Sequence, residues 1–196
     1  MTGYLPGRLR RLAVTLALLL LGVGVAHAAV HPVRGFLPDL KFSLQGANGT
    51  TITQQAFEGK VVLMFFGYAS CPDICPTTMA QLAQVTAALG PQADQVRIVF
   101  VSVDPHRDTP DILQAYVDLF DPHAIGLTGN EREIADLARR YRVAYQIERP
   151  DPDSASYEVA HSRGIYAFNQ VGQAVWLASD SEAQEDLLAA LRPLLK

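Results

Sequence analysis

The stretch VVLMFF, from Val61 to Phe66, decides the fold together with the segment Cys71 to Pro76 (CPDICP) that follows it. An unbroken apolar run of this length is typical of a strand buried on both faces of a sheet. Helical spacing of apolar residues comes next, at Met79, Leu82, Val85 and Leu89, and Gly90-Pro91 ends it. The sequence therefore predicts a buried strand, a cysteine-bearing loop and a helix, in that order.

The rest of the chain continues the alternation of strands and helices. The predicted elements are a hairpin from Leu40 to Thr53, a second buried strand from Ile98 to Val103, a helix beginning at Pro110, a short strand from Ala124 to Leu127, a helix beginning after Asn130, strands from Glu158 to Phe168 and from Gln173 to Leu177, and a helix after Ser179 to Glu182. Strand–helix alternation predicts parallel pairing, and the late hairpin adds antiparallel strands. We expect an α/β fold with a mixed sheet, helices on both faces and an N-terminal β-hairpin. A cysteine pair between a buried strand and the next helix is the thioredoxin arrangement.

Residues 1–28 have the pattern of an export signal. Arg8, Arg10 and Arg11 precede an apolar stretch from Leu12 to Val25, and residues 26–28 (AHA) offer a cleavage site. The uncharged run continues to Val33, so residues 12–33 could instead remain as a membrane anchor. We expect residues 1–28 to be a signal peptide or an N-terminal membrane anchor and residues 29–196 to form the domain. Either outcome places the domain outside the cytoplasm, in the periplasm or at the outer face of the inner membrane.

Composition excludes several classes of protein. The chain has 196 residues, 16 Lys+Arg, 20 Asp+Glu and a formal net charge of −4. Without residues 1–28, which hold three arginines and no acidic residue, 168 residues of net charge −7 remain. This acidic balance argues against nucleic-acid binding. Two cysteines cannot form a multi-disulfide scaffold or a four-cysteine metal site, so Cys71 and Cys75 act as one pair.

The loop from Cys71 to Pro76 favours reactive thiols. Each cysteine precedes a proline, which predicts a non-helical loop as far as Pro76 and places Cys75 near a helix N-terminus. The positive end of a helix favours the thiolate form, which attacks disulfides and binds soft metals. Three residues between the cysteines allow a structural disulfide, a redox-active pair or a site for one ion. Two thiolates and an imidazole suit Cu(I) and accommodate Cu(II).

The segment FFGYASCPDICPTTM, from Phe65 to Met79, resembles the signature of the Sco/SenC family of copper proteins. Two further segments agree in order and spacing, from Val101 to Pro110 and from Leu127 to Tyr145. The resemblance covers the chain from about Phe36 to the C-terminus. It implies a thioredoxin-like fold, one copper ion bound by two cysteines and a distal histidine, and a role in building the CuA centre of cytochrome c oxidase. The implied partners are the copper-bearing subunit of the oxidase or another copper chaperone.

His161 occupies the position of the family's third ligand, in the strand predicted from Glu158 to Phe168. The family usually has Asp immediately before this histidine, whereas this chain has Ala160, which puts the tuning of the site in doubt. Asp73 and Asp104 could supply outer carboxylates or simply cap loops. His106 and His123 are expected to be solvated loop residues.

The position of His31 predicts a separate, auxiliary Cu(II) site. Cleavage after Ala28 would leave Ala29-Val30-His31 as the mature start, in which the amine, two backbone nitrogens and the imidazole can form a square-planar Cu(II) site. The alternative is a chance histidine in a flexible leader.

The leading functional interpretation is a copper metallochaperone or assembly factor without turnover, using Cys71, Cys75 and His161. The alternative is an extracytoplasmic thiol–disulfide oxidoreductase that reduces partner cysteines with Cys71 and Cys75 and does not need His161. A third interpretation, a peroxidase of the peroxiredoxin kind, would use one thiolate against peroxide.

Overall fold

The computed structural model describes residues 30–148 and 157–196. In this part of the chain, six strands form one mixed sheet in the order β1-β10-β9-β4-β5-β6. Their bounds are β1 His31–Pro32, β4 Val61–Gly67, β5 Val96–Ser102, β6 Ile125–Leu127, β9 Gly164–Phe168 and β10 Ala174–Ser179. β4 pairs in parallel with β5, as β5 does with β6, while β9 pairs antiparallel with β4 and β10. The predicted mixed sheet and late hairpin are confirmed.

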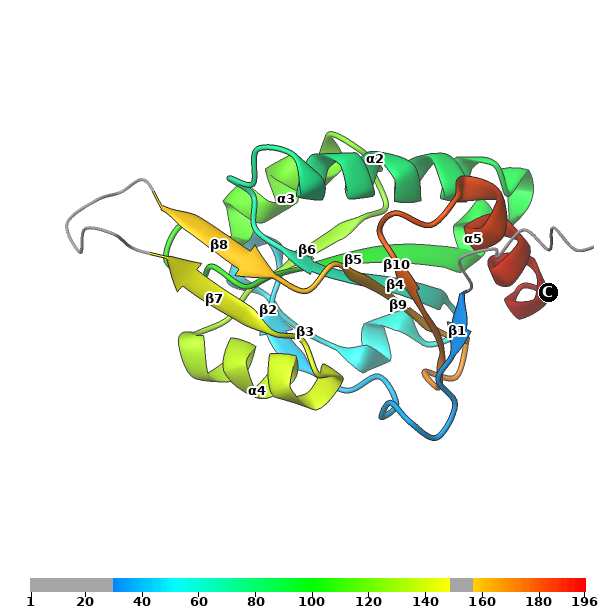
Figure 1. The fold of residues 1–196 in the computed structure, drawn as a ribbon, viewed down its shortest axis with the longest axis horizontal. Helices are drawn as coiled ribbons and strands as arrows, with labels where there is room; N and C mark the ends of the chain where they lie inside the picture. Colours follow the sequence, from blue (N-terminus) through cyan, green and yellow to red (C-terminus); the bar gives the residue numbers. More distant parts are fainter. Residues whose placement is uncertain (1–29, 149–156) are drawn as a thin grey trace, which may run out of the picture.

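Helices cover both faces of this sheet (Figure 1). α2 (Ile74–Ala87), α3 (Pro110–Asp118) and α5 (Gln184–Leu191) lie on one face, and α4 (Glu131–Tyr141) lies on the other. α4 begins with the predicted capping box, in which the Asn130 side chain accepts the Glu133 N–H and the Glu133 carboxylate accepts the Asn130 N–H. The α/β fold expected from the sequence is thus present.

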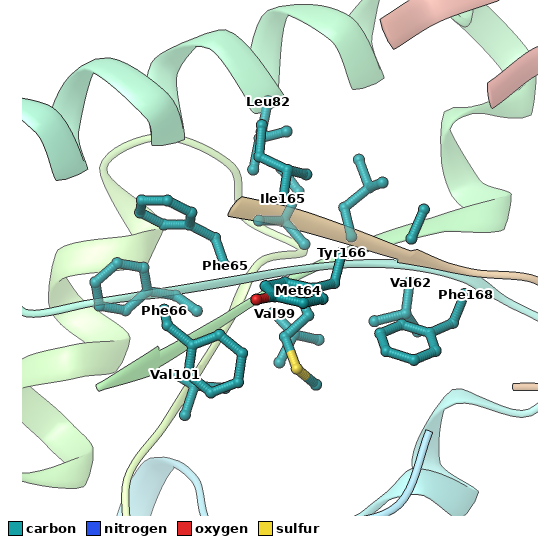
Figure 2. Close-up of a cluster of buried hydrophobic side chains, with 14 of the residues drawn as sticks. Val62, Met64, Phe65, Phe66, Leu82, Val99, Val101, Ile165, Tyr166 and Phe168 are labelled. Carbon is teal, nitrogen blue, oxygen red and sulfur yellow. The ribbon is translucent and has the colours of Figure 1, made fainter. Parts of the chain in front are cut away.

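β4 is the centre of the hydrophobic core, and every one of its residues is buried. Its side chains alternate between the two faces, as period-two geometry requires. Phe65 lies on the α2 side with Ile165 and Leu82, whereas Met64 and Phe66 point to the opposite side (Figure 2). A strand buried on both faces gives a fixed end at Gly67, from which the cysteine loop departs.

Among the described residues, two short hairpins lie outside the main sheet. β2 (Ser43–Gln45) and β3 (Thr51–Thr53) form the predicted N-terminal hairpin. β7 (Tyr145–Glu148) and β8 (Glu158–His161) form the second, which projects from one end of the molecule (Figure 1). The single strand predicted from Glu158 to Phe168 is therefore wrong: β8 pairs with β7, and β9 starts only at Gly164. The break occurs at Ser162, whose N–H donates to the Ala144 carbonyl and closes the base of the hairpin.

The start of α2 also differs from the prediction. The helix begins at Ile74, so Cys75 is already helical although Pro76 follows it. The first turn of a helix leaves its N–H groups without intrahelical partners, so a proline there removes no hydrogen bond. Prolines therefore constrain this loop less than the sequence suggested.

Residues 1–28, predicted to be a signal or an anchor, lie outside the described residues. Within residues 30–148 and 157–196, no helix combines the length and apolar character that crossing a membrane requires.

Candidate metal centre

The cysteine loop connects the buried end of β4 to the first turn of α2. Cys71 lies in the loop and is partly exposed, whereas Cys75 in α2 has no exposed surface. Both are free thiols. Cys75 packs against Gly67 so closely that a Cβ on Gly67 would lie 2.7 Å from the Cys75 Sγ. The absent side chain of Gly67 thus leaves the space that the buried sulfur occupies.

His161 reaches this sulfur from the end of β8. Its Nε2 lies 3.5 Å from the Cys75 Sγ, and its Nδ1 lies 3.0 Å from the Ser162 carbonyl oxygen. A proton on Nδ1 satisfies that carbonyl and leaves the Nε2 lone pair directed at the cysteines. The rings of Phe65 and Tyr68 stand edge-on to the imidazole, with centroids 6.0 Å away in both cases. The histidine is therefore held by packing on two sides.

The donor atoms of Cys71, Cys75 and His161 all lie within 4.8 Å of one another. Metal–sulfur and metal–nitrogen bonds of about 2.0–2.3 Å place ligands of one ion roughly 3.5–4 Å apart. The three side chains therefore need only a small contraction to hold a single ion. Two sulfurs and one imidazole are a soft donor set, of the kind that selects Cu(I) over hard cations.

The two thiols differ in acidity. Burial alone would raise the pKa of Cys71. Hydrogen bonds to its sulfur from the backbone N–H groups of Cys75 and Asp73 and from the Cys75 thiol outweigh burial, so the pKa of Cys71 is lowered. Burial raises the pKa of Cys75 far above its ordinary value, and the nearby Cys71 adds to the effect. Cys71 is thus the more available thiolate, and Cys75 keeps its proton until a cation replaces it.

Burial also lowers the pKa of His161 below its ordinary value, against the opposing effect of the Ser162 carbonyl. The imidazole is therefore neutral at pH 7, as a metal ligand must be. A surface depression of about 380 Å³ opens over Cys71 and His161, lined by the cysteine loop and the whole of β8. An incoming ion or a partner's ligand can reach the site through this opening.

Comparison with known proteins agrees with this geometry. The model of the family described as SCO1/SenC matches residues 37–196. The chain belongs to the SCO1/SenC family. The resemblance of its motifs to that family is thereby confirmed.

Three relatives illustrate the similarity. A SCO2-like protein of Rickettsia prowazekii is 36% identical over 132 residues, which are 67% of this chain and 64% of that protein. The mitochondrial SCO2 homologue of Mus musculus is 37% identical over 153 residues, 77% of this chain and 60% of that protein. The chain thus spans less than two thirds of the length of these curated relatives. The structure of Bradyrhizobium japonicum ScoI with copper bound superposes with a TM-score of 0.70 at 35% identity, covering 86% of this chain and all of that chain.

This SCO1/SenC chain brings together the three residues singled out as ligands, with Asp73 beside them in the lining of the depression and the other candidates outside that lining. Asp73 precedes α2 without capping it through its side chain. His31 lies exposed in β1, paired with Leu177 at the edge of the sheet. The exposed His106 has its Nε2 2.6 Å from a Glu131 carboxylate oxygen, and His123 is exposed.

Asp104 is fully buried, but its carboxylate accepts hydrogen bonds from Arg107 and Tyr157 rather than contacting the cysteines or the histidine. Sequence reasoning missed Arg107 and Tyr157, and also Tyr68, whose ring packs on His161. Arg107 lies in one of the segments that matched the family, which was the one available signal. Tyr157 carries no signal in the sequence, because its role depends on the β7–β8 hairpin, of which the sequence predicts only β8, as part of a longer strand.

Proposed function

We propose that this chain is a copper metallochaperone that binds one copper ion through Cys71, Cys75 and His161 and delivers it to, or helps mature, the CuA centre of cytochrome c oxidase. The observation that carries the proposal is the convergence of two thiols and a neutral imidazole within 4.8 Å beneath an open depression. A solved relative at 35% identity holds copper, and the family match extends over the whole site.

The unequal thiols suit binding followed by release. Cys71 is partly exposed and ionises more readily, so it is the group suited to meet incoming copper first. Cys75 then loses its proton and His161 completes the site. A partner approaching through the depression meets the exposed edge of the site, at Cys71 and His161, before it meets the buried Cys75.

Transfer to a partner tests this function directly. Copper-loaded chain is mixed with the metal-free form of the oxidase domain that carries the CuA centre, a one-electron oxidant such as ferricyanide is added to form the mixed-valence state, and the absorption of that centre is followed. The proposal predicts that the absorption develops with the loaded wild type and not with a Cys71→Ser/Cys75→Ser variant that has been exposed to the same copper and freed of unbound metal. An equal yield from both, or from free copper alone at the same concentration, contradicts delivery by this chain.

A second candidate, reduction of a partner's disulfide, is favoured by the free thiol pair and by the acidity of Cys71. It requires the cysteines but not the histidine, so His161→Ala separates the two functions. Copper delivery predicts that His161→Ala weakens copper binding while the rate of reduction of a model disulfide stays unchanged. Unchanged copper affinity would remove His161 from the site and favour the reductase.

The remaining expectations are proposals about the amino end. Residues 1–28 would direct export to the periplasm or anchor the domain at the outer face of the inner membrane, and residues 29–196 would form the copper-binding domain. Cleavage after Ala28 would create the auxiliary Cu(II) site at His31. The intact mass of the exported protein tests both, since any other N-terminus excludes the site at His31.

A further inference from the structure

A buried polar cluster joins the hairpin that carries His161 to the body of the domain. Asp104, two residues after the end of β5, has no exposed surface, and both of its carboxylate oxygens accept hydrogen bonds. One accepts a hydrogen bond from the Arg107 Nε at 2.5 Å, and the other accepts one from the Tyr157 hydroxyl at 2.7 Å. Tyr157 directly precedes β8 and lies four residues before His161. We call Asp104, Arg107 and Tyr157 the hairpin anchor.

Arg107 contributes more than charge to the hairpin anchor. While its Nε binds Asp104, its Nη1 donates to the Tyr157 carbonyl at 2.9 Å, and its guanidinium lies 3.7 Å from the centroid of the Tyr157 ring. The same guanidinium is 5.4 Å from the ring of Tyr68, which stands at 89° to the His161 imidazole. Arg107 therefore contacts both the backbone before β8 and a ring that packs on the ligand.

The hairpin depends on such contacts because, among the described residues, β7 and β8 pair only with each other and not with the six-stranded sheet. A buried carboxylate without partners is costly, so Asp104 favours the docked hairpin, in which the Tyr157 hydroxyl completes its hydrogen bonds. A planar guanidinium binds a carboxylate, a carbonyl and two rings at once, which an ammonium cannot do.

From this geometry, and resting on the proposed copper site, we propose that Arg107 and Tyr157 are positioning residues that set His161 against Cys71 and Cys75 and thereby set the copper affinity of the site. Asp104 then acts on the site through the hairpin and not as a direct neighbour of the ion. Outer partners that orient a ligand typically contribute 10- to 100-fold to metal affinity.

Two conservative variants test the hairpin anchor. Arg107→Lys keeps the positive charge but loses the planar guanidinium, which binds Asp104 and the Tyr157 carbonyl and stacks on the Tyr157 ring. Tyr157→Phe removes only the hydroxyl group that donates a hydrogen bond to Asp104. Arg139→Lys is the matched control, because Arg139 forms an exposed pair with Asp136. In the metal-free full chain, hydrogen exchange at the amides of Val159 to His161 should become about tenfold faster in both variants and stay unchanged in the control. Unchanged exchange in both variants would overturn the anchor, whether or not the chain binds copper.

A double-mutant cycle then tests positioning through His161. Arg107→Lys and Tyr157→Phe should each weaken Cu(I) affinity about tenfold or more in the wild type, measured by competition with a chromophoric chelator. In a His161→Ala background the same substitutions should have no further effect, because the ligand that they orient is gone. An equal loss in both backgrounds would show a general structural role and refute positioning. A wild type that binds no copper refutes the proposed function, and the exchange measurement still decides the anchor.

Discussion

At the scale of single residues, the two cysteines of the site are chemically unequal although they are only four positions apart. Cys71 lies where backbone N–H groups converge on a partly exposed sulfur, and Cys75 lies in the core against Gly67. One loop thus contains a reactive thiol and a protected one. The sequence places Cys75 near a helix N-terminus and predicts that its thiolate is favoured, which is wrong: β4 and α2 bury this sulfur, and burial raises the pKa of Cys75 instead.

This asymmetry predicts selective alkylation. Reduced, metal-free chain treated with iodoacetamide at pH 7 should be modified at Cys71 at least about tenfold faster than at Cys75, because only Cys71 combines access with a lowered pKa. Peptide mass mapping over time measures both rates in one sample, and the unfolded chain in urea is the control in which the rates should converge. Equal rates in the folded chain would contradict the assigned environments.

At the scale of elements, the site is assembled from two parts: the buried β4–loop–α2 unit, and the β7–β8 hairpin, which has fewer strand pairings. β4 and α2 belong to the core, so they fix the two sulfurs, while the β7–β8 hairpin brings the imidazole from outside the main sheet. The strand–loop–helix unit was predictable from the run Val61 to Phe66 and the helical spacing after it. The hairpin was not predictable, because the break at Ser162 depends on a contact with Ala144 that lies 18 positions away.

Close packing of β4 on α2 predicts that Gly67→Ala disturbs the site. The new Cβ would meet the Cys75 Sγ at 2.7 Å and the Phe100 ring at 2.9 Å, both in the core. We expect a loss of about 1–3 kcal/mol in the free energy of unfolding and a weaker copper affinity. Urea denaturation and chelator competition measure the two effects.

Gly164→Ala is the matched control, since its Cβ meets mainly the end of the Leu177 side chain, which can move. Gly164→Ala should lower the free energy of unfolding by less than Gly67→Ala does and should leave copper affinity nearly unchanged. If Gly67→Ala behaved like the control, the sulfur would not be confined as described.

At the scale of the whole molecule, the sheet supports the site through a second buried carboxylate, that of Asp108. Its Oδ2 accepts hydrogen bonds from the Ser102 hydroxyl at 2.6 Å and the Ala69 N–H at 2.9 Å, so it joins β5 to the start of the cysteine loop. Its Oδ1 is buried without a hydrogen-bond partner among the described residues. Burial raises the pKa of Asp108 despite the hydrogen bond from Ser102.

A raised pKa makes ionisation of Asp108 unfavourable to the folded state. Its contribution to stability is complete below the pKa of the unfolded chain, about 3.9, and is lost as the pH rises through the folded pKa. Asp108→Asn should therefore flatten the fall in the free energy of unfolding with rising pH above about pH 4. Urea denaturation across pH 4–8 measures the slope, with exposed Asp94→Asn as the control. Wild type and Asp108→Asn curves that stay parallel would contradict a raised pKa.

The central claim is that this SCO1/SenC chain holds one copper ion between Cys71, Cys75 and His161. Copper X-ray absorption of the reduced, Cu(I)-loaded chain, with the metal content measured on the same sample, tests it most directly. The account predicts one copper per chain with two sulfur ligands and one nitrogen ligand, and loss of the nitrogen ligand in His161→Ala. A copper without sulfur ligands, or a nitrogen ligand that persists unchanged in His161→Ala, would contradict it.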